Sequence, residues 1–190
     1  MRVIAGKFRS RPLRSLRGLD IRPTSDRLRE TLFDVLIAGN PVALEGSVWV
    51  DLFAGTGAVG IEALSRGAAM VHFAESSKRA AGIIQANLQS LGIKEGFEIL
   101  PKDSIRVIAD LERRSVRADY IFLDPPYAMR EAYEQTLSRL DHSASAKAAI
   151  IIAEHEKRFD PGERFGTLKR FRQLSQGDAV LSFYRPTSAT

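Results

Sequence analysis

The sequence predicts an α/β domain whose mostly parallel sheet is covered by helices on both faces. Apolar strand-like runs alternate with amphipathic helical segments from residue 47 to residue 153. A glycine-rich turn directly follows the first of these strands, and two strands near the C-terminus flank a short polar turn. Because successive parallel strands connect through right-handed crossovers, this alternation indicates one parallel sheet that ends in a hairpin.

The individual elements follow from hydrophobic periodicity and from the residues that begin and end helices. The first helix begins at Thr24 or Ser25, carries Asp26 in its first turn and stops at Gly39. Glycine also closes the second helix, at Gly67. The predicted helices span residues 25–38, 61–65, 77–91, 105–113 and 130–140, and the predicted strands span residues 47–53, 70–75, 97–100, 119–123, 148–153, 167–174 and 179–184.

The N-terminal part of the chain is strongly basic. Residues 2–17 alternate between apolar and basic side chains, which predicts a short hairpin with a charged face. Residues 1–30 carry a net charge of +6, whereas the rest of the chain carries −1. Such a segment favours a polyanionic partner, and a solvated tail is the alternative. We therefore expect a basic extension over residues 1–40 that docks RNA and a main domain over residues 41–190.

The 190-residue chain contains no cysteine, which excludes several kinds of chemistry. Disulfides, thiolate metal sites, iron–sulfur clusters and a cysteine nucleophile are all ruled out. No apolar run approaches the roughly 18 residues that cross a bilayer, and the N-terminus lacks the apolar core of a signal peptide. We therefore expect a cytoplasmic, monomeric protein with no membrane partner and no metal.

The segment from Asp51 to Gly60 follows a strand and opens a helix, which is the context of a nucleotide-binding glycine turn. Gly55 and Gly57 let the backbone approach a ligand, and the helix N-terminus offers unpaired N–H groups. Glu75 ends the next strand, where its carboxylate can bind both hydroxyls of a ribose. The glycine spacing also matches a dinucleotide fingerprint, so NAD binding and a turn without a ligand stay open.

An acid at Asp51 favours one class of ligand. It would repel a pyrophosphate but suits a cationic ammonium or sulfonium, as in S-adenosylmethionine (SAM). Asp103 has two interpretations, since it can accept a hydrogen bond from an adenine amino group or cap the following helix. The residues predicted to contact the cofactor are Asp51, Phe53, Ala54, Gly55, Thr56, Gly57, Glu75, Ser76, Asp103 and Ser104.

A buried strand ends in Asp124, Pro125, Pro126 and Tyr127, which are the predicted catalytic residues. The prolines make the loop stiff, so the Asp124 carboxylate and the Pro125 carbonyl are held as two acceptors. An exocyclic base amine offers two donors but is a poor nucleophile, because its lone pair is delocalised into the ring. Acceptors on both hydrogens draw the nitrogen toward sp³ geometry, and Tyr127 would stack on the base. The alternative is a proline-stopped strand beside a core tyrosine.

Four colinear segments together resemble the RsmD family of bacterial 16S rRNA guanine-N2 methyltransferases. They are residues 22–33, 51–57, 62–67 and 124–127. The last segment alone marks amino-group methylation, and the first makes the assignment specific. The resemblance implies a class I SAM-dependent methyltransferase fold, which is Rossmann-like with a seven-stranded, mostly parallel sheet and an antiparallel last strand. The sequence departs from the family at His155, where small or acidic residues are more common.

The resemblance also implies the substrate and the partner. The target would be the N2 amine of the guanine conventionally numbered 966 in 16S rRNA, within the small ribosomal subunit, with SAM as methyl donor. The basic N-terminus would contact rRNA phosphates with an affinity that falls as salt rises. Helix capping and ordinary surface charge are the alternative roles for the contacts from residue 22 onward. The residues predicted to bind RNA are Arg2, Lys7, Arg9, Arg11, Arg22, Thr24 and Arg27.

Three other functions stay open on the residues alone. The nearest is another exocyclic-amine methyltransferase that acts on N6 of adenine in DNA or on a different RNA. A non-catalytic nucleotide- or RNA-binding module is a second, although the intact motif at residues 124–127 disfavours it. An NAD-dependent oxidoreductase is the third. Methylation of cytosine C5 is excluded, because its covalent mechanism needs a cysteine.

Overall fold

The computed structural model describes residues 1–15 and 25–187. Its helices are α1 (Asp26–Ile37), α2 (Ala58–Ser65), α3 (Lys78–Ser90), α4 (Ser104–Arg113) and α5 (Arg130–Asp141), with short 3-10 turns at Gly6–Phe8 and Ala144–Ala146. Its strands are β1 (Val48–Asp51), β2 (Met70–Ala74), β3 (Phe97–Leu100), β4 (Tyr120–Leu123), β5 (Ile150–Glu156), β6 (Arg164–Phe165), β7 (Leu168–Gln176) and β8 (Ala179–Pro186).

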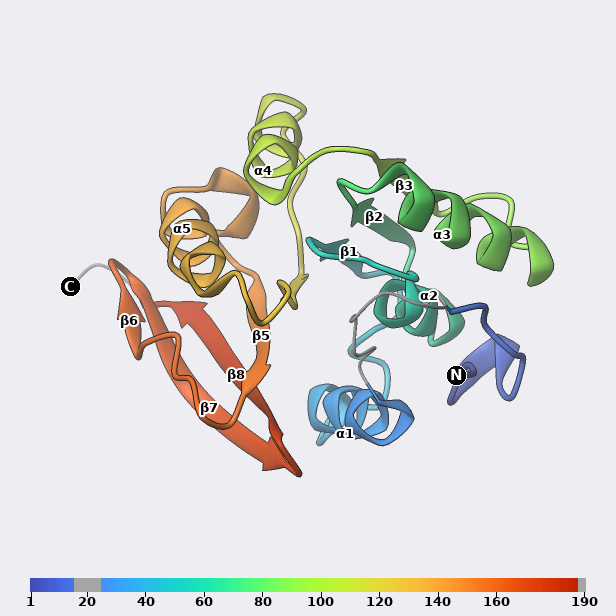
Figure 1. The fold of residues 1–190 in the computed structure, drawn as a ribbon, viewed down its shortest axis with the longest axis horizontal. Helices are drawn as coiled ribbons and strands as arrows, with labels where there is room; N and C mark the ends of the chain where they lie inside the picture. Colours follow the sequence, from blue (N-terminus) through green and yellow to red (C-terminus); the bar gives the residue numbers. More distant parts are fainter. Residues whose placement is uncertain (16–24, 188–190) are drawn as a thin grey trace.

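These elements form three layers (Figure 1). The sheet lies in the middle, with α4 and α5 packed on one face. On the other face, α1, α2 and α3 share a core with the N-terminal segment, centred on Trp49 and Phe33. The predicted α/β architecture is therefore confirmed.

Within the described residues the sheet has eight strands in the order β3-β2-β1-β4-β5-β8-β7-β6. Strands β3, β2, β1, β4 and β5 are parallel, whereas β8 is antiparallel to both of its neighbours. The antiparallel last strand is thus confirmed, but the expected number of seven strands was one too few. The additional strand, β6, contains only two residues, which is too short to give a periodic signal.

The helix boundaries differ from prediction by a few residues. Ser25, rather than Thr24, is the N-cap of α1, because its side chain accepts a hydrogen bond from the Leu28 N–H at 3.1 Å. Helix α2 begins at Ala58, three residues before the predicted start at residue 61. Gly57 caps this helix in the left-handed conformation, with φ of 78°, so the turn passes directly into the helix.

The prediction of a short hairpin over residues 2–17 was wrong in detail. Residues 1–15 form a loop with one antiparallel bridge, between Arg2 and Pro12, and a 3-10 turn inside it. Val3 and Leu13 are buried in the core that also contains residues of α1, α2 and α3. The loop therefore packs against the helices instead of pairing with itself along its length.

A buried carboxylate on α2 explains why no regular hairpin forms. The Glu62 side chain is fully buried and accepts hydrogen bonds from the backbone N–H groups of Ile4 at 2.7 Å and Ala5 at 2.9 Å. It also accepts from Arg66 Nε at 2.8 Å and lies 3.8 Å from Arg29 Nε. Two N–H groups that a ladder would use are thus satisfied by α2.

Candidate active site

A cavity of about 460 Å³ opens at the carboxyl ends of the parallel strands. This is where open α/β sheets bind ligands, and the volume lies within the usual range for small-molecule sites. Its wall is formed by the ends of β1, β2 and β4 together with α4 and α5. The predicted residues that line it come from both groups, the cofactor contacts and the catalytic loop: Phe53, Gly55, Glu75, Ser76, Asp103, Ser104, Asp124 and Pro126.

The glycine turn has the backbone geometry that its sequence predicts. Gly55 and Gly57 both have positive φ, of 53° and 78°, which L side chains rarely adopt. A Cβ on Gly60 would lie 2.3 Å from the Phe73 ring and 2.7 Å from the Val71 side chain. The third glycine therefore allows α2 to pack closely on β2, and this contact fixes the turn against the sheet.

Glu75 connects this turn to the next strand. One carboxylate oxygen accepts the Gly55 N–H at 2.9 Å, and the other accepts the Ser77 N–H at 2.8 Å. Each carboxylate oxygen has a second lone pair, so the side chain keeps acceptor capacity toward the cavity that it lines. Contact with a ribose stays a prediction.

Asp51 lies beneath the turn and is 2% exposed. Its Oδ2 accepts the Gly60 N–H at 3.3 Å, so it ties the end of β1 to the first turn of α2. Burial raises the pKa of Asp51 to about 7, against the lowering effect of the Gly60 hydrogen bond and with a further rise from the charge of Glu75. Asp51 is outside the cavity lining, as are Ala54, Thr56 and Gly57, which are buried behind it.

Asp103 has the capping role that was one of its two interpretations. Its Oδ1 accepts the Arg106 N–H at 2.9 Å, which makes Asp103 the N-cap of α4. The same residue also lines the cavity, beside Ser104, whose hydroxyl lies 3.3 Å from that of Thr136 on α5. Capping is thus confirmed, and a contact with adenine remains compatible with this position.

The acids at the carboxyl ends of four strands share one face of the sheet. Glu75, Asp51, Asp124 and Glu154 each follow by two residues a side chain of the core that contains α1 and α2. Burial raises the pKa of Asp124 well above its ordinary value, and the charges of Glu154 and Asp51 raise it further. Asp124 therefore holds a proton more readily than an exposed carboxyl does.

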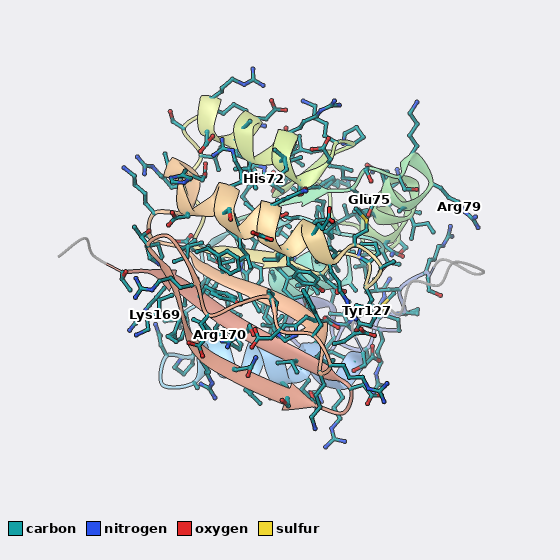
Figure 2. The ribbon with its side chains drawn as sticks, turned by 60° about the vertical axis from the view of Figure 1, so that its left-hand side comes forward. His72, Glu75, Arg79, Tyr127, Lys169 and Arg170 are labelled. Carbon is teal, nitrogen blue, oxygen red and sulfur yellow. The ribbon has the colours of Figure 1, made fainter. Side chains whose placement is uncertain are left out.

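The other three residues of the predicted catalytic loop differ in their position relative to the cavity. Pro126 lines the cavity, whereas Pro125 is buried and Tyr127 is half-buried outside the lining. Figure 2 shows Tyr127 and Glu75 toward the same end of the molecule. The structure brings Asp124 and Pro126 to the cofactor residues, and the stacking role of Tyr127 stays a prediction.

Sequence reasoning missed the contribution of α5. Met129, Ala132, Gln135 and Thr136 all line the cavity, and the Met129 side chain is 52% exposed at its edge. Positions 132, 135 and 136 lie on one side of a helix, so the spacing was present in the sequence. The missing information was the direction of α5, which runs past the cavity directly after the catalytic loop. Lys102, between β3 and α4, also lines the cavity and was not among the predicted site residues.

Three of the predicted RNA-binding residues lie away from the cavity. Arg2, Lys7, Arg9, Arg11 and Arg27 are exposed, and Arg22 and Thr24 lie outside the described residues. The Phe8 N–H donates to Ser65 Oγ at 3.0 Å, and Arg11 Nη2 donates to the Ser90 carbonyl at 3.1 Å. Since these serines are the last residues of α2 and α3, Lys7, Arg9 and Arg11 lie at the helix ends remote from the cavity.

His155 is buried, and its ring nitrogens lie 2.9 Å from Ser182 Oγ and 3.0 Å from the Glu156 carbonyl, which places it in the packing of β5 against β8.

Over residues 1–15 and 25–187, no cluster of three or more His, Cys, Asp or Glu side chains has an arrangement able to hold a metal ion. In that same part of the chain, every helix is too short or too polar to span a membrane.

Comparison with known proteins agrees with this geometry. The Escherichia coli structure described as putative methyltransferase yhhF superimposes with a TM-score of 0.82 at 26% identity, over 100% of this chain and 99% of that one. The putative rRNA methyltransferase YlbH of Bacillus subtilis is 31% identical over 186 residues, which are 97% of this chain and 98% of that protein. The ribosomal RNA small subunit methyltransferase D of Haemophilus influenzae is 38% identical over 159 residues, 83% of this chain and 79% of that protein.

The fold is that of the class I SAM-dependent methyltransferases, as the resemblance to the RsmD family implied. The model of the family described as conserved hypothetical protein 95 matches residues 1–185. Because that match spans nearly the whole chain and the relatives named above align over most of their length, the chain belongs to this family, the RsmD family.

Proposed function

We propose that this protein transfers a methyl group from SAM to the N2 amine of the guanine numbered 966 in 16S rRNA, on the small ribosomal subunit. The observation that carries the proposal is one cavity shared by Gly55 of the glycine turn, Glu75 at the end of β2 and the proposed catalytic acid Asp124. The names of the curated relatives, which are rRNA methyltransferases, support the substrate class. We further propose that the protein acts as a cytoplasmic monomer.

The residues of the cavity fit SAM. Its apolar lining includes Leu52, Ala74 and Ile105, which suit the flat face of an adenine. The acids Asp51, Glu75 and Asp124 lie in or beneath the wall, and a nearby cation would favour the ionised forms of Asp51 and Asp124, whereas the pyrophosphate of a dinucleotide would oppose them. The NAD alternative is therefore the weaker one. When bound, SAM supplies a methyl group activated by its sulfonium charge.

The catalytic loop prepares the amine for attack. The Asp124 carboxylate and the Pro125 carbonyl accept the two amine hydrogens and aim the nitrogen lone pair, an effect of positioning more than of basicity. As the new N–C bond forms, the amine proton becomes acidic and passes to Asp124. The environment that raises the pKa of Asp124 helps it to retain this proton until it leaves to water.

The closing test is transfer of tritium from labelled SAM to small subunits that lack the modification, followed by mapping of the labelled nucleotide. We expect label at one guanine of 16S rRNA, no label with subunits that already carry the methyl group, and none with the Asp124→Asn variant. Label on adenine, on DNA or on large-subunit rRNA would overturn the proposal. A thermal-shift comparison should show stabilisation by S-adenosylhomocysteine and none by NADH.

A further inference from the structure

The C-terminal strands β7 and β8 contain cations and exposed aromatic surface but no acid. Neither Leu168–Gln176 nor Ala179–Pro186 includes an Asp or a Glu. We define as the basic sheet face four residues that lie here: Lys169, Phe171, Arg172 and Arg185. All four are exposed, in a part of the chain whose overall charge is close to neutral.

The strand register places these four side chains on one side of the sheet. Lys169 is directly opposite Arg185, and the ladder then shifts by one residue at Phe171, so that Arg172 is opposite Phe183. Phe183 belongs to the core on the α1 side, so the basic sheet face looks toward that side. Phe171 follows Lys169 by two residues and contacts Phe183 and Arg185, so it lies on the same face, and the bulge turns Arg172 to that face as well, which regular alternation would not have done.

The Phe171 side chain contacts neighbouring side chains but remains exposed. Its ring lies 6.2 Å from that of Phe183 and 5.0 Å from the Arg185 guanidinium, yet 43% of its surface is exposed. An exposed aromatic with a fixed orientation costs little conformational entropy on binding and offers a flat surface for stacking. The guanidinium beside it adds a charge that can reach a phosphate.

Arg170, the residue before Phe171, is paired and largely buried, unlike the cations of the basic sheet face. Arg170 lies on the other face of β7, where its guanidinium pairs with Asp160 at 2.6 Å and 3.1 Å and is largely buried. Over the described residues, Lys169, Arg172 and Arg185 have no acidic partner within ion-pair distance, so their charges are available to an external ligand.

We propose that the basic sheet face is a second RNA-binding surface, on which an unpaired base stacks on Phe171 while Lys169, Arg172 and Arg185 contact the flanking phosphates. This inference rests on the proposed function, because it assigns the surface to the same rRNA. A sheet that presents an aromatic among cations is a general solution for binding single-stranded RNA, since every base has a face that can stack.

The surface is distant from the cavity. Leu123, the residue before Asp124, is level with Ala153 on β5 and Ser182 on β8, and Arg185 lies three residues further along β8. Strand β7 is also three strand positions from β4, about 14 Å across the sheet at the usual strand spacing. Figure 2 shows Lys169 at the end of the molecule away from Glu75 and Tyr127. The basic sheet face would therefore bind RNA that flanks the target base, not the target itself.

Protection of a sheet edge is the competing explanation for the cations. Beyond the two residues of β6, strand β7 has a free edge, and lysine or arginine on an edge discourages pairing between copies. That role needs charge but does not need the aromatic ring. Substitution of Phe171 therefore separates the two explanations.

The test measures binding of the full-length protein to unmodified small subunits. We expect Phe171→Leu, which keeps an apolar side chain but cannot stack in the same way, to weaken binding about tenfold, and Phe171→Tyr to retain it. The paired change Lys169→Ala with Arg172→Ala should flatten the log–log salt dependence by about 1.5. Lys94→Ala, on an exposed loop before β3 at the opposite edge of the sheet, is the matched control and should change nothing.

The KM for subunits should rise in Phe171→Leu and in the Lys169→Ala, Arg172→Ala double variant, while kcat and the affinity for S-adenosylhomocysteine stay at wild-type values. Wild-type binding by Phe171→Leu would overturn the inference and favour edge protection. A concentration-dependent dimer that Phe171→Leu abolishes would also overturn it, because the face would then bind a second copy. Failure of the wild-type protein to methylate subunits would instead defeat the proposed function, so the two failures are distinguishable.

Discussion

The two ends of the parallel strands carry opposite charge. At the carboxyl ends, Glu75, Asp51, Asp124 and Glu154 lie on one face of the sheet, in or beside the cavity. At the other end, cations are exposed near the ends of α2 and α3 and on the basic sheet face. Figure 1 shows α1 between the N-terminal segment and the β7–β8 hairpin.

This difference separates chemistry from affinity. The acids that position an amine and favour a sulfonium would repel the phosphates of the RNA that carries the amine. Cations at the far end of α3, which is about 20 Å long, or three strand positions away on β7 can supply phosphate contacts without neutralising the acids, since charges separated by more than a Debye length of about 8 Å are screened at physiological salt. The comparison predicts that variants at one end change turnover and variants at the other change binding.

The largest effect should come from Asp124→Asn. The amide keeps the shape but is a weaker acceptor and cannot take the amine proton, so we expect methyl transfer to fall about 10³-fold. Affinity for S-adenosylhomocysteine, measured by calorimetry, should stay within a few-fold of wild type. Glu156→Gln, an acid two residues beyond Glu154 on β5, is the control. Activity within tenfold of wild type would remove Asp124 from its role.

The packing of residues 1–15 against α2 should depend on the buried Glu62 carboxylate. Glu62→Gln leaves the Arg29 and Arg66 guanidinium groups without their shared counter-charge, and we expect a loss of about 3 kcal/mol in the free energy of unfolding. Urea denaturation measures this change, with Glu95→Gln on an exposed loop as control. A loss below about 1 kcal/mol would show that the backbone contacts hold the segment without the charge.

The cations near the ends of α2 and α3 should affect RNA binding alone. Lys7→Ala with Arg9→Ala removes two exposed charges, so the log–log salt slope should become shallower by about 1.5 and affinity at physiological salt should fall about tenfold. These substitutions are cleaner than a deletion, because Val3 and Leu13 of the same segment belong to the core. A fall in kcat with unchanged binding would contradict the division between the two ends.

Sequence reasoning located the acidic end better than the basic end. The glycine turn, Glu75 and the Asp124 loop are short motifs at the ends of predicted strands, and a parallel sheet brings such ends together regardless of loop details. The α5 lining and the basic sheet face depend on helix direction and on a bulge at Phe171, and neither leaves a local pattern. The backbone N–H partners of Glu62, Ile4 and Ala5, lie 58 and 57 residues away in the sequence, so only the folded chain identifies them.

The smallest expected effect is on the pH dependence of the preference for a cationic ligand, through Asp51. Because the pKa of Asp51 is raised to about 7, its carboxylate is only partly ionised at neutral pH. A cationic sulfonium nearby favours the ionised form, whereas the neutral thioether of S-adenosylhomocysteine does not. We therefore expect the preference for SAM over S-adenosylhomocysteine to increase a few-fold as pH rises through 7, and Asp51→Asn to abolish that increase.

The same substitution gives an independent check through stability. The folded state binds the Asp51 proton more tightly than the unfolded state, so this group lowers the free energy of unfolding as pH rises from about 4 to about 7. Asp51→Asn removes that contribution while its amide oxygen still accepts the Gly60 N–H. The variant should therefore gain stability relative to wild type at pH 8 compared with pH 4. A constant difference across that range would place the pKa of Asp51 near its ordinary value and remove the basis for charge selection.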